Sequence, residues 1–467
     1  MRPTSFLAAA IVLVHALALA DDFETPPAQP AAASLPPELA SGPDFHVREP
    51  VESDGLMHHY VIDSRFGEFT AYGGQALKVR VGEMAALTEL AKKNDVGVVA
   101  KAVETNVQDQ AKTVKQFVTH PVGTVTGIPR GIGHLFSGAK AQAHELGDEA
   151  KKDTSGCDDA SATKAQSGPS GSAATSDAAP PPCNSAGTTR KIARNAQTAA
   201  SRYADKYLGL SAAERRYYQS LHVDPYTDNK VLRRAVHHLA KIEATTNLGL
   251  HFAGIPGVPY LNDVRRAMDA VYNEDPAVLR ARQRKVLADD GLSAAEIERF
   301  ENTWLLSPTR QLILEEAAKS LVGVDGRDEI YRHAMSVTSE AEVEVFIESV
   351  RLLVRVHASH PVVHLLPGLR LPCALTRDGR IVVVGAFDAV SWTQDVAEYE
   401  SSLHAALPPE TQGLDLWLSG SISPQAQHEL AARGWQVHTE AWASLPESQP
   451  QAAQPQAGQP QAAHAAP

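Results

Sequence analysis

The chain has 467 residues, of which 43% are hydrophobic, and its formal net charge is -12 at pH 7. That length suffices for one large hydrophobic core or for two smaller ones. The acidic balance excludes nucleic acid as a partner, because its phosphates require a basic face, and it disfavours broad attraction to anionic lipid.

Residues 1–20 have the order of a secretory signal peptide. Arg2 precedes an apolar run from Leu7 to Leu19, and small residues end at Ala20 before two aspartates. We therefore expect cleavage after Ala20 and export to the periplasm or out of the cell. The run is too short for a membrane anchor and no later stretch is long and apolar enough, so no transmembrane span is predicted.

Residues 21–44 are rich in proline and alanine and predict a disordered leader. Residues 45–151 open with three short strand-like stretches, and the Asp54-Gly55 pair between two of them is a hairpin signal. An antiparallel β-meander is expected there, followed by amphipathic helices whose apolar residues recur every three or four positions. His58 and His59 alternate across one strand and give only a weak signal for a metal site.

A glycine-rich apolar stretch within residues 114–138 has two interpretations. It packs as a loop against the core of its own domain, or it lies on a membrane surface. The side chains that would make the membrane contact are Val118, Ile128, Ile132, Leu135 and Phe136.

Residues 152–188 are low in complexity and predict a disordered insertion. Cys157 and Cys183 lie near its two ends. In an oxidising compartment they would form a disulfide that stabilises the fold by about 3 to 4 kcal/mol, and two free thiols in a linker are the alternative. Cys373 lies in an apolar stretch and is interpreted as a buried thiol rather than a catalytic one.

Residues 189–360 contain the strongest helix signals. The hexapeptide GLSAAE occurs at residues 209–214 and again at 291–296, and each copy places Ser three residues before Glu. This spacing predicts a capping box at the start of a helix. Further helix starts are marked at Pro276 and Pro308, so an irregular helical bundle is expected.

Residues 361–445 predict a small α/β lobe. Two strands flank a turn at Asp378-Gly379, and the helices and strands that then alternate imply parallel pairing. Residues 446–467 repeat a Gln-, Pro- and Ala-rich unit and predict a disordered tail. The predicted fold class is therefore α+β and predominantly helical, with a β-meander plus helices, a central helical bundle and a C-terminal α/β lobe.

A histidine cluster is the candidate metal site of this sequence. His357, His360 and His364 lie at and beyond the end of a predicted helix, and neutral imidazoles bind zinc. The H-E-x-x-H pattern does not occur, and the carboxylate that would complete a catalytic site cannot be named. A helix end also favours histidine for capping and packing, in which case no cofactor is expected.

A second candidate site lies at the strand-to-helix turn that contains Ser421 and Ser423. Backbone amides at such a helix start hold anions, as they do in many α/β proteins. The same residues are also what an ordinary turn requires, because serine is a good N-cap and the proline that follows fits the first helical position.

Three functional hypotheses follow. The first is an exported, non-enzymatic binding or scaffold protein of the cell envelope, with an envelope protein as partner. The second is an exported hydrolase, metal-dependent or otherwise, although the sequence contains no G-x-S-x-G elbow. The third is a peripheral membrane protein that acts through residues 114–138. One sequence does not define the oligomeric state.

Overall fold

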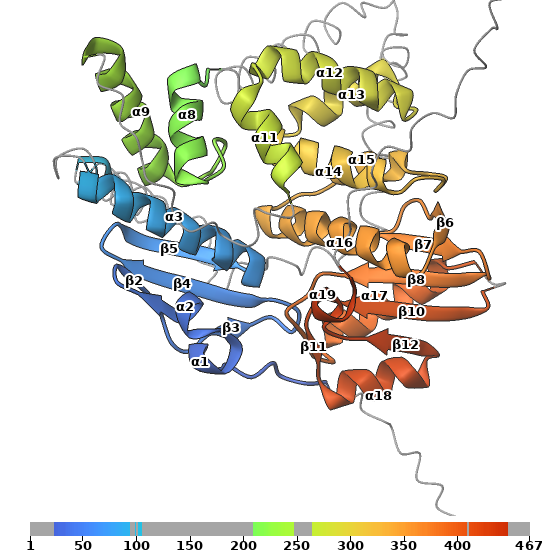
Figure 1. Ribbon diagram of the computed structural model, residues 1–467. Coiled ribbons are helices and arrows are strands. Elements are labelled where there is room, and N and C mark those ends of the chain that lie inside the picture. The colour runs from blue at the N-terminus through green and yellow to red at the C-terminus, as the bar shows by residue number, and fades with distance from the viewer. Residues whose placement is uncertain are drawn as a thin grey trace, which may run out of the picture.

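The computed structural model describes residues 23–93, 99, 101–104, 209–246, 264–408 and 411–446. An antiparallel N-terminal sheet and a mixed C-terminal sheet lie side by side, and helices cover both (Figure 1). The predicted α+β class is confirmed, and helices predominate.

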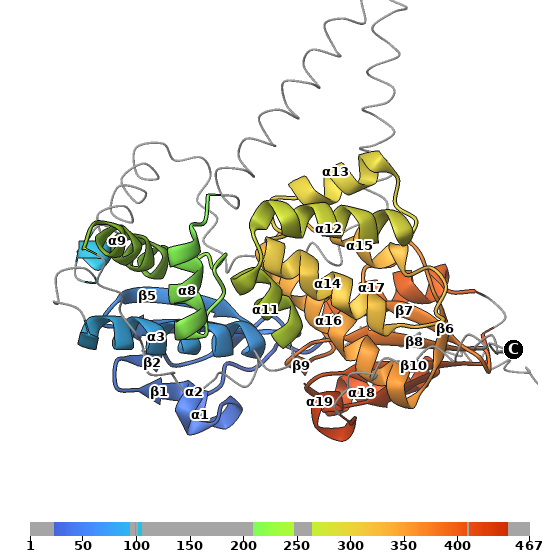
Figure 2. The ribbon, with the colours of Figure 1, turned by 45° about the horizontal axis from the view of Figure 1, so that its top comes forward.

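The N-terminal sheet is centred on one long strand. Its strands are β1 (Ser41–Gly42), β2 (Phe45–Val47), β3 (Glu52–Ser53), β4 (His58–Ser64) and β5 (Gly67–Tyr72). Strand β4 pairs with β2 and β3 on one edge and with β5 on the other, always antiparallel, as predicted. Helix α3 (Gly74–Lys93) covers the sheet, and Leu77 packs with Tyr60 and Ile62 in the core between them (Figure 2).

The prediction of a disordered leader is wrong for residues 23–44. Helices α1 (Ala31–Ser34) and α2 (Pro37–Ala40) form there, and Gln29 pairs with Val51 through two backbone hydrogen bonds of 2.9 and 2.7 Å. Ala31 is buried in the same core as Tyr60. A segment of low hydrophobicity does not fold alone, but here the sheet supplies the apolar surface and the backbone partners.

Two helices pack on the outer side of α3. They are α8 (Ala212–Leu221) and α9 (Lys230–Thr246), and their apolar faces share a core with Met84, Leu87 and Leu90. The predicted capping box at the start of α8 is confirmed, because Ser211 Oγ accepts from Glu214 N and the Glu214 carboxylate accepts from Ser211 N.

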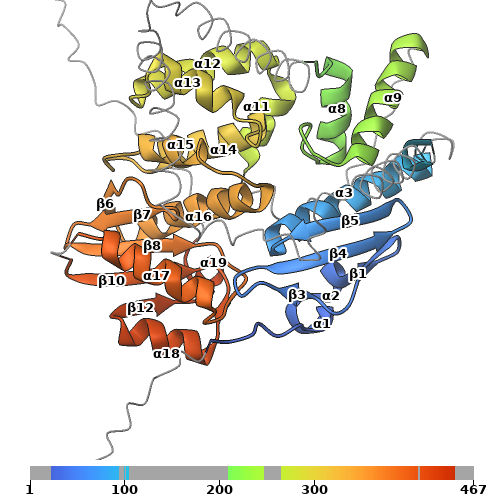
Figure 3. The ribbon, with the colours of Figure 1, turned by 180° about the vertical axis from the view of Figure 1, so that it is seen from behind.

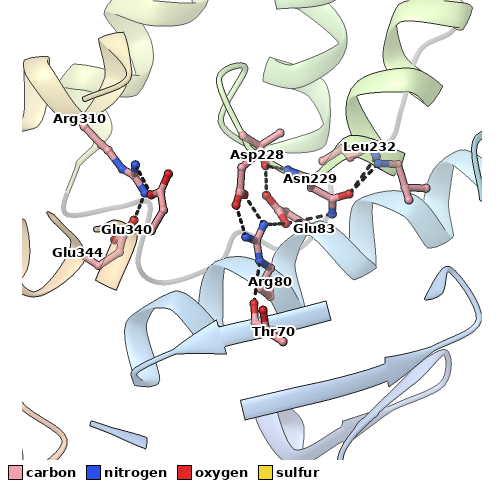
Figure 4. A network of polar contacts seen from close by, with 11 residues as sticks. Thr70, Arg80, Glu83, Asp228, Asn229, Leu232, Arg310, Glu340 and Glu344 are labelled. Carbon is pink, nitrogen blue, oxygen red and sulfur yellow. Dashed lines mark hydrogen bonds and ion pairs between the residues drawn. The ribbon is translucent and has the colours of Figure 1, made fainter. Parts of the chain in front are cut away.

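A buried carboxylate joins α3 to the turn before α9 (Figure 4). Glu83 is 2% exposed and accepts hydrogen bonds from Thr227, from Asn229 Nδ2 at 3.1 Å and from Arg80 at 2.9 Å. Arg80 also bonds to Asp228 at 2.7 Å. The network therefore fixes the α8–α9 pair on α3 through charge-assisted hydrogen bonds.

The irregular helical bundle lies above the C-terminal sheet. Its helices are α11 (Arg265–Asn273), α12 (Pro276–Asp289), α13 (Ala294–Asn302), α14 (Pro308–Ser320), α15 (Asp328–Ala334) and α16 (Glu340–Ser359). The second predicted capping box is confirmed at the start of α13, between Ser293 and Glu296.

The C-terminal lobe is a five-stranded sheet with the order β12-β10-β8-β7-β6. Its elements are β6 (Val362–Leu365), β7 (Cys373–Thr376), β8 (Arg380–Gly385), α17 (Gln394–Ala406), β10 (Gly413–Leu418), α18 (Pro424–Ala432) and β12 (Trp435–His438). Strands β8, β10 and β12 are parallel, as predicted, whereas β6 and β7 pair antiparallel. The short helix α19 (Ala441–Ser444) follows β12, so this strand is shorter than expected.

The side chains of β8 point alternately to the two faces of the sheet and are apolar on both, so both faces are covered. Val382 and Val384 share a core with residues of α16, whereas Ile381 and Val383 share one with residues of α17 and α18. Figure 3 shows α17 on the face opposite to α16. A small parallel pair, β9 (Ala389–Val390) and β11 (Ser421–Ile422), extends beyond the ends of β8 and β10. Within the described residues, no helix has the length and apolar character that crossing a membrane requires.

Candidate functional site

A cavity of about 360 Å³ lies where the N-terminal sheet, the start of α3, helix α16 and the C-terminal lobe meet. We call it the junction cavity. Its wall includes Asp388, which follows β8, and Gly420, which follows β10. The carboxyl ends of parallel strands are the usual location of ligand sites in α/β proteins. The residues that line the junction cavity include His58, Tyr60, Gly74, Gln75, Ala76, Lys78, Glu344, Glu348 and Asp388.

Asp388 joins the two sheets at this cavity. Its carboxylate accepts hydrogen bonds from the backbone amides of His58 at 3.0 Å and of Gly74 at 3.1 Å. Its own backbone amide donates to Leu56 O at 2.9 Å. Burial raises the pKa of Asp388, and the two amide hydrogen bonds oppose that effect.

Only glycine fits beside the backbone of Asp388 at position 420. A Cβ on Gly420 would lie 2.0 Å from Asp388 O, which is far inside van der Waals contact. The turns after β8 and β10 are therefore in direct contact, and this contact holds Asp388 at the wall of the cavity.

His58 has a buried ring nitrogen without a hydrogen-bond partner among the described residues. The residue is 7% exposed, and its Nδ1 lies 3.2 Å from Tyr60 Oη and 3.8 Å from Asp388 Oδ2. When the Tyr60 hydroxyl donates to Nδ1, the neutral ring carries its proton on Nε2. No hydrogen-bond partner for Nε2 exists among the described residues. A buried donor of this kind is costly unless a ligand or water satisfies it.

Two glutamates in the cavity wall form ion pairs with arginines. Glu344 forms an ion pair with Arg310, which also bonds to Glu340 at 2.7 Å (Figure 4). Glu348 bonds to Arg351 at 2.7 Å, and both side chains are less than one tenth exposed. Lys78, by contrast, has no ion-pair partner within the part of the chain that the structure describes.

Asp54 supports the strand that carries His58. It accepts hydrogen bonds from the backbone amides of Met57 at 2.9 Å and Leu56 at 3.0 Å and from the Tyr72 hydroxyl. Burial acts to raise the pKa of Asp54, but these hydrogen bonds and the nearby His59 lower it overall. Asp54 therefore stabilises the turn as a carboxylate.

The predicted histidine cluster is spread over the end of α16 and strand β6. His357 Nδ1 accepts the backbone amide of Val362 at 3.2 Å, and burial lowers the pKa of His357. The His360 ring lies 4.8 Å from that of Trp417, and His364 belongs to β6 beside Gly326. In the described residues no three His, Cys, Asp or Glu side chains are grouped so that they could hold a metal. Zinc binding thus stays a prediction.

The predicted anion site is occupied by the chain's own carboxylate. Ser423 Oγ caps α18 by accepting from Ala426 N at 3.0 Å, and it donates to Glu24 Oε2 at 2.5 Å. The same oxygen of Glu24 accepts the amide of Trp392 at 2.5 Å. Ser421 uses its backbone amide to bond Asp388 O at 3.1 Å.

The remaining predicted residues divide into two groups. Cys157, Cys183 and the five apolar residues of the membrane hypothesis (Val118, Ile128, Ile132, Leu135 and Phe136) lie outside the described residues. Cys373 is 2% exposed, and burial raises the pKa of its thiol, which agrees with a buried, unreactive cysteine.

Sequence reasoning did not select Lys78 or Asp388 and gave little weight to His58. One signal was present, because Asp388 follows a strand of consecutive valines, the position where parallel sheets place ligand groups. The turn predicted to hold a ligand, at Ser421 and Ser423, follows β10 instead. No protein-family model matches this chain, and neither the curated proteins nor the solved structures include a match.

Proposed function

We propose that this chain is an exported, non-enzymatic binding protein and that its ligand site is the junction cavity. One observation carries the proposal: His58 Nε2, a buried polar atom without a partner among the described residues, belongs to a residue that lines a cavity of about 360 Å³. Pockets of this size at the junction of two structural units are the usual location for a small ligand.

Export is part of the proposal and rests on the first 20 residues, which have the order of a signal peptide. The partner or ligand would then be a component of the envelope or of the surrounding medium. The cavity and the folded leader that lines part of it, at Ser34 and Leu35, belong to the chain after the expected cleavage.

Native mass spectrometry tests binding directly. The full chain, expressed with its own leader, is recovered from an oxidising compartment and measured under gentle conditions, with the expected result that the mature mass carries a small molecule in addition. Ala76→Trp, which fills the cavity from the first turn of α3, should abolish that additional mass. Lys92→Trp, on the exposed far end of the same helix, should retain it.

A folded wild-type protein that carries no small molecule, and whose melting temperature no small molecule from envelope extracts raises, would contradict the proposal. The same holds if the additional mass persists in a folded Ala76→Trp variant. Export is checked separately by N-terminal sequencing, with Asp21 expected as the first residue.

A hydrolase is the second candidate, because His58 Nδ1 lies 3.8 Å from Asp388 Oδ2. In the other tautomer of His58, with the proton on Nδ1, a carboxylate on that side orients the ring and leaves Nε2 as the general base. Turnover of ester, amide or phosphate substrates that is lost in Asp388→Asn would favour this candidate. For the metal-dependent version, elemental analysis should give zinc that disappears in His357→Ala and His360→Ala.

A further inference from the structure

Several hydrogen-bond donors of the junction cavity have no acceptor among the described residues. His58 Nε2 is buried without a partner, and Lys78 has no ion-pair partner, in both cases among the described residues. The first amides of any helix also lack intrahelical acceptors. In α3 the amide of Gly74 bonds to Asp388, whereas those of Gln75 and Ala76, which line the cavity, have no acceptor in the described part of the chain.

The carboxylates of the cavity wall already have hydrogen-bond or ion-pair partners. Asp388 accepts two backbone amides, Glu344 forms an ion pair with Arg310, and Glu348 forms one with Arg351. Lys78 is the Lys/Arg side chain of the described wall, and no ion-pair partner for it exists among the described residues. The N-terminus of a 20-residue helix adds a partial positive charge at the same place.

We infer that the ligand of the junction cavity is a small organic acid whose carboxylate binds between Lys78, His58 and the first amides of α3. This inference rests on the proposed function and names the chemical class of its ligand. One carboxylate would accept from the buried donor of His58 and would pair with the Lys78 ammonium, which has no ion-pair partner among the described residues. The volume of about 360 Å³ is at the lower end of the range for ligand sites.

Isothermal titration calorimetry with matched probes tests the inference. The probes are acetate, succinate and benzoate, the corresponding primary amides acetamide, succinamide and benzamide, and the amines ethylamine and benzylamine. We expect the wild-type chain to bind at least one carboxylate about tenfold more tightly than its amide, because a charge-assisted hydrogen bond is lost with the amide. Lys78→Met should weaken carboxylate binding by about tenfold or more.

Lys92→Met is the matched control, because Lys92 lies on the same helix, is exposed and pairs with Glu89. It should leave the affinity unchanged. His58→Leu provides a second variant at the cavity, and Lys78→Met keeps the test decisive if His58→Leu does not fold, since Lys78 makes no ion pair among the described residues.

Two results would overturn the inference and leave the proposed function intact. In the first, amines bind better than carboxylates and Ala76→Trp abolishes their binding. In the second, a carboxylate binds equally well to wild type and to Lys78→Met. If neither these probes nor a molecule from the envelope binds the folded wild-type chain, the inference and the proposed function both fail.

Discussion

The carboxylate of Asp388 accepts the backbone amide of His58 at 3.0 Å, although the two residues are 330 positions apart in the chain. This contact joins β4, the central strand of the N-terminal sheet, to the segment that follows β8 in the C-terminal lobe. The same carboxylate accepts the amide of Gly74 at the start of α3. Asp388 is therefore a link between the two units as well as part of the cavity wall.

Replacing Asp388 should loosen this junction. Asp388→Ala leaves the amides of His58 and Gly74 without an acceptor, and we expect it to lower the free energy of unfolding by about 2 to 4 kcal/mol. Asp388→Asn retains one acceptor oxygen and should cost clearly less. Urea unfolding measures both, and hydrogen exchange at residues 58 and 74 reports where protection is lost. Equal stabilities for the two variants would show that the carboxylate does not act as an acceptor.

Glu24 should anchor the N-terminal segment to the C-terminal lobe. Glu24→Ala removes the acceptor for Trp392 N and Ser423 Oγ, and the expected cost is about 1 to 2 kcal/mol. Limited proteolysis should then cleave near residue 24 faster than in wild type. Glu38→Ala, on the exposed side of α2, is the control and should be cleaved at the wild-type rate.

The buried carboxylate of Glu83 should contribute far more to stability than a surface carboxylate of the same helix. Glu83→Gln weakens the bonds to Arg80 and Asn229 inside the protein, with an expected loss of about 2 to 4 kcal/mol. Glu89→Gln breaks only the exposed pair with Lys92 and should cost less than about 0.5 kcal/mol. Thermal unfolding followed by circular dichroism compares them, and similar melting temperatures would contradict the prediction.

Asp224 should make stability fall as the pH rises from about 4 to about 6. Burial raises the pKa of Asp224 from 3.8 to about 6, so the folded state holds a proton that the unfolded state has released in this interval. The free energy of unfolding should fall by about 2 to 3 kcal/mol in total, and this loss should stay constant at higher pH. Urea unfolding at a series of pH values measures it as the difference between wild type and Asp224→Asn, because His333, whose pKa is lowered by burial to about 4, changes stability in the opposite direction over the same interval.

Asp224→Asn should remove that fall, because its side-chain oxygen can still accept from Tyr226 N and Thr309 Oγ1. The variant is therefore expected to be more stable than wild type at pH 7 by up to the same amount. Asp275→Asn, at an exposed helix N-cap where asparagine caps equally well, should keep the wild-type pH profile. If the free energy of unfolding of Asp224→Asn falls by the same amount over this pH interval, another titrating group causes the fall.

The local structure of this protein was largely predictable from its sequence. Ser211 and Ser293 each begin a helix through a capping box, because the interacting groups are three residues apart and need no distant partner. The valines of β8 and the helices between parallel strands were predictable for a similar reason, since periodicity records which faces are buried.

Tertiary structure alone decided the candidate site. His58 has a cavity to line because the N-terminal sheet is placed against the C-terminal lobe, and Asp388, which fixes that placement, is 330 residues away. Residues 23–44 fold for the same reason, since their partners Val51 and Trp392 belong to the assembled surface. Sequence patterns encode the period of one element, whereas a cavity and an unpaired buried donor arise only when elements distant in sequence pack together.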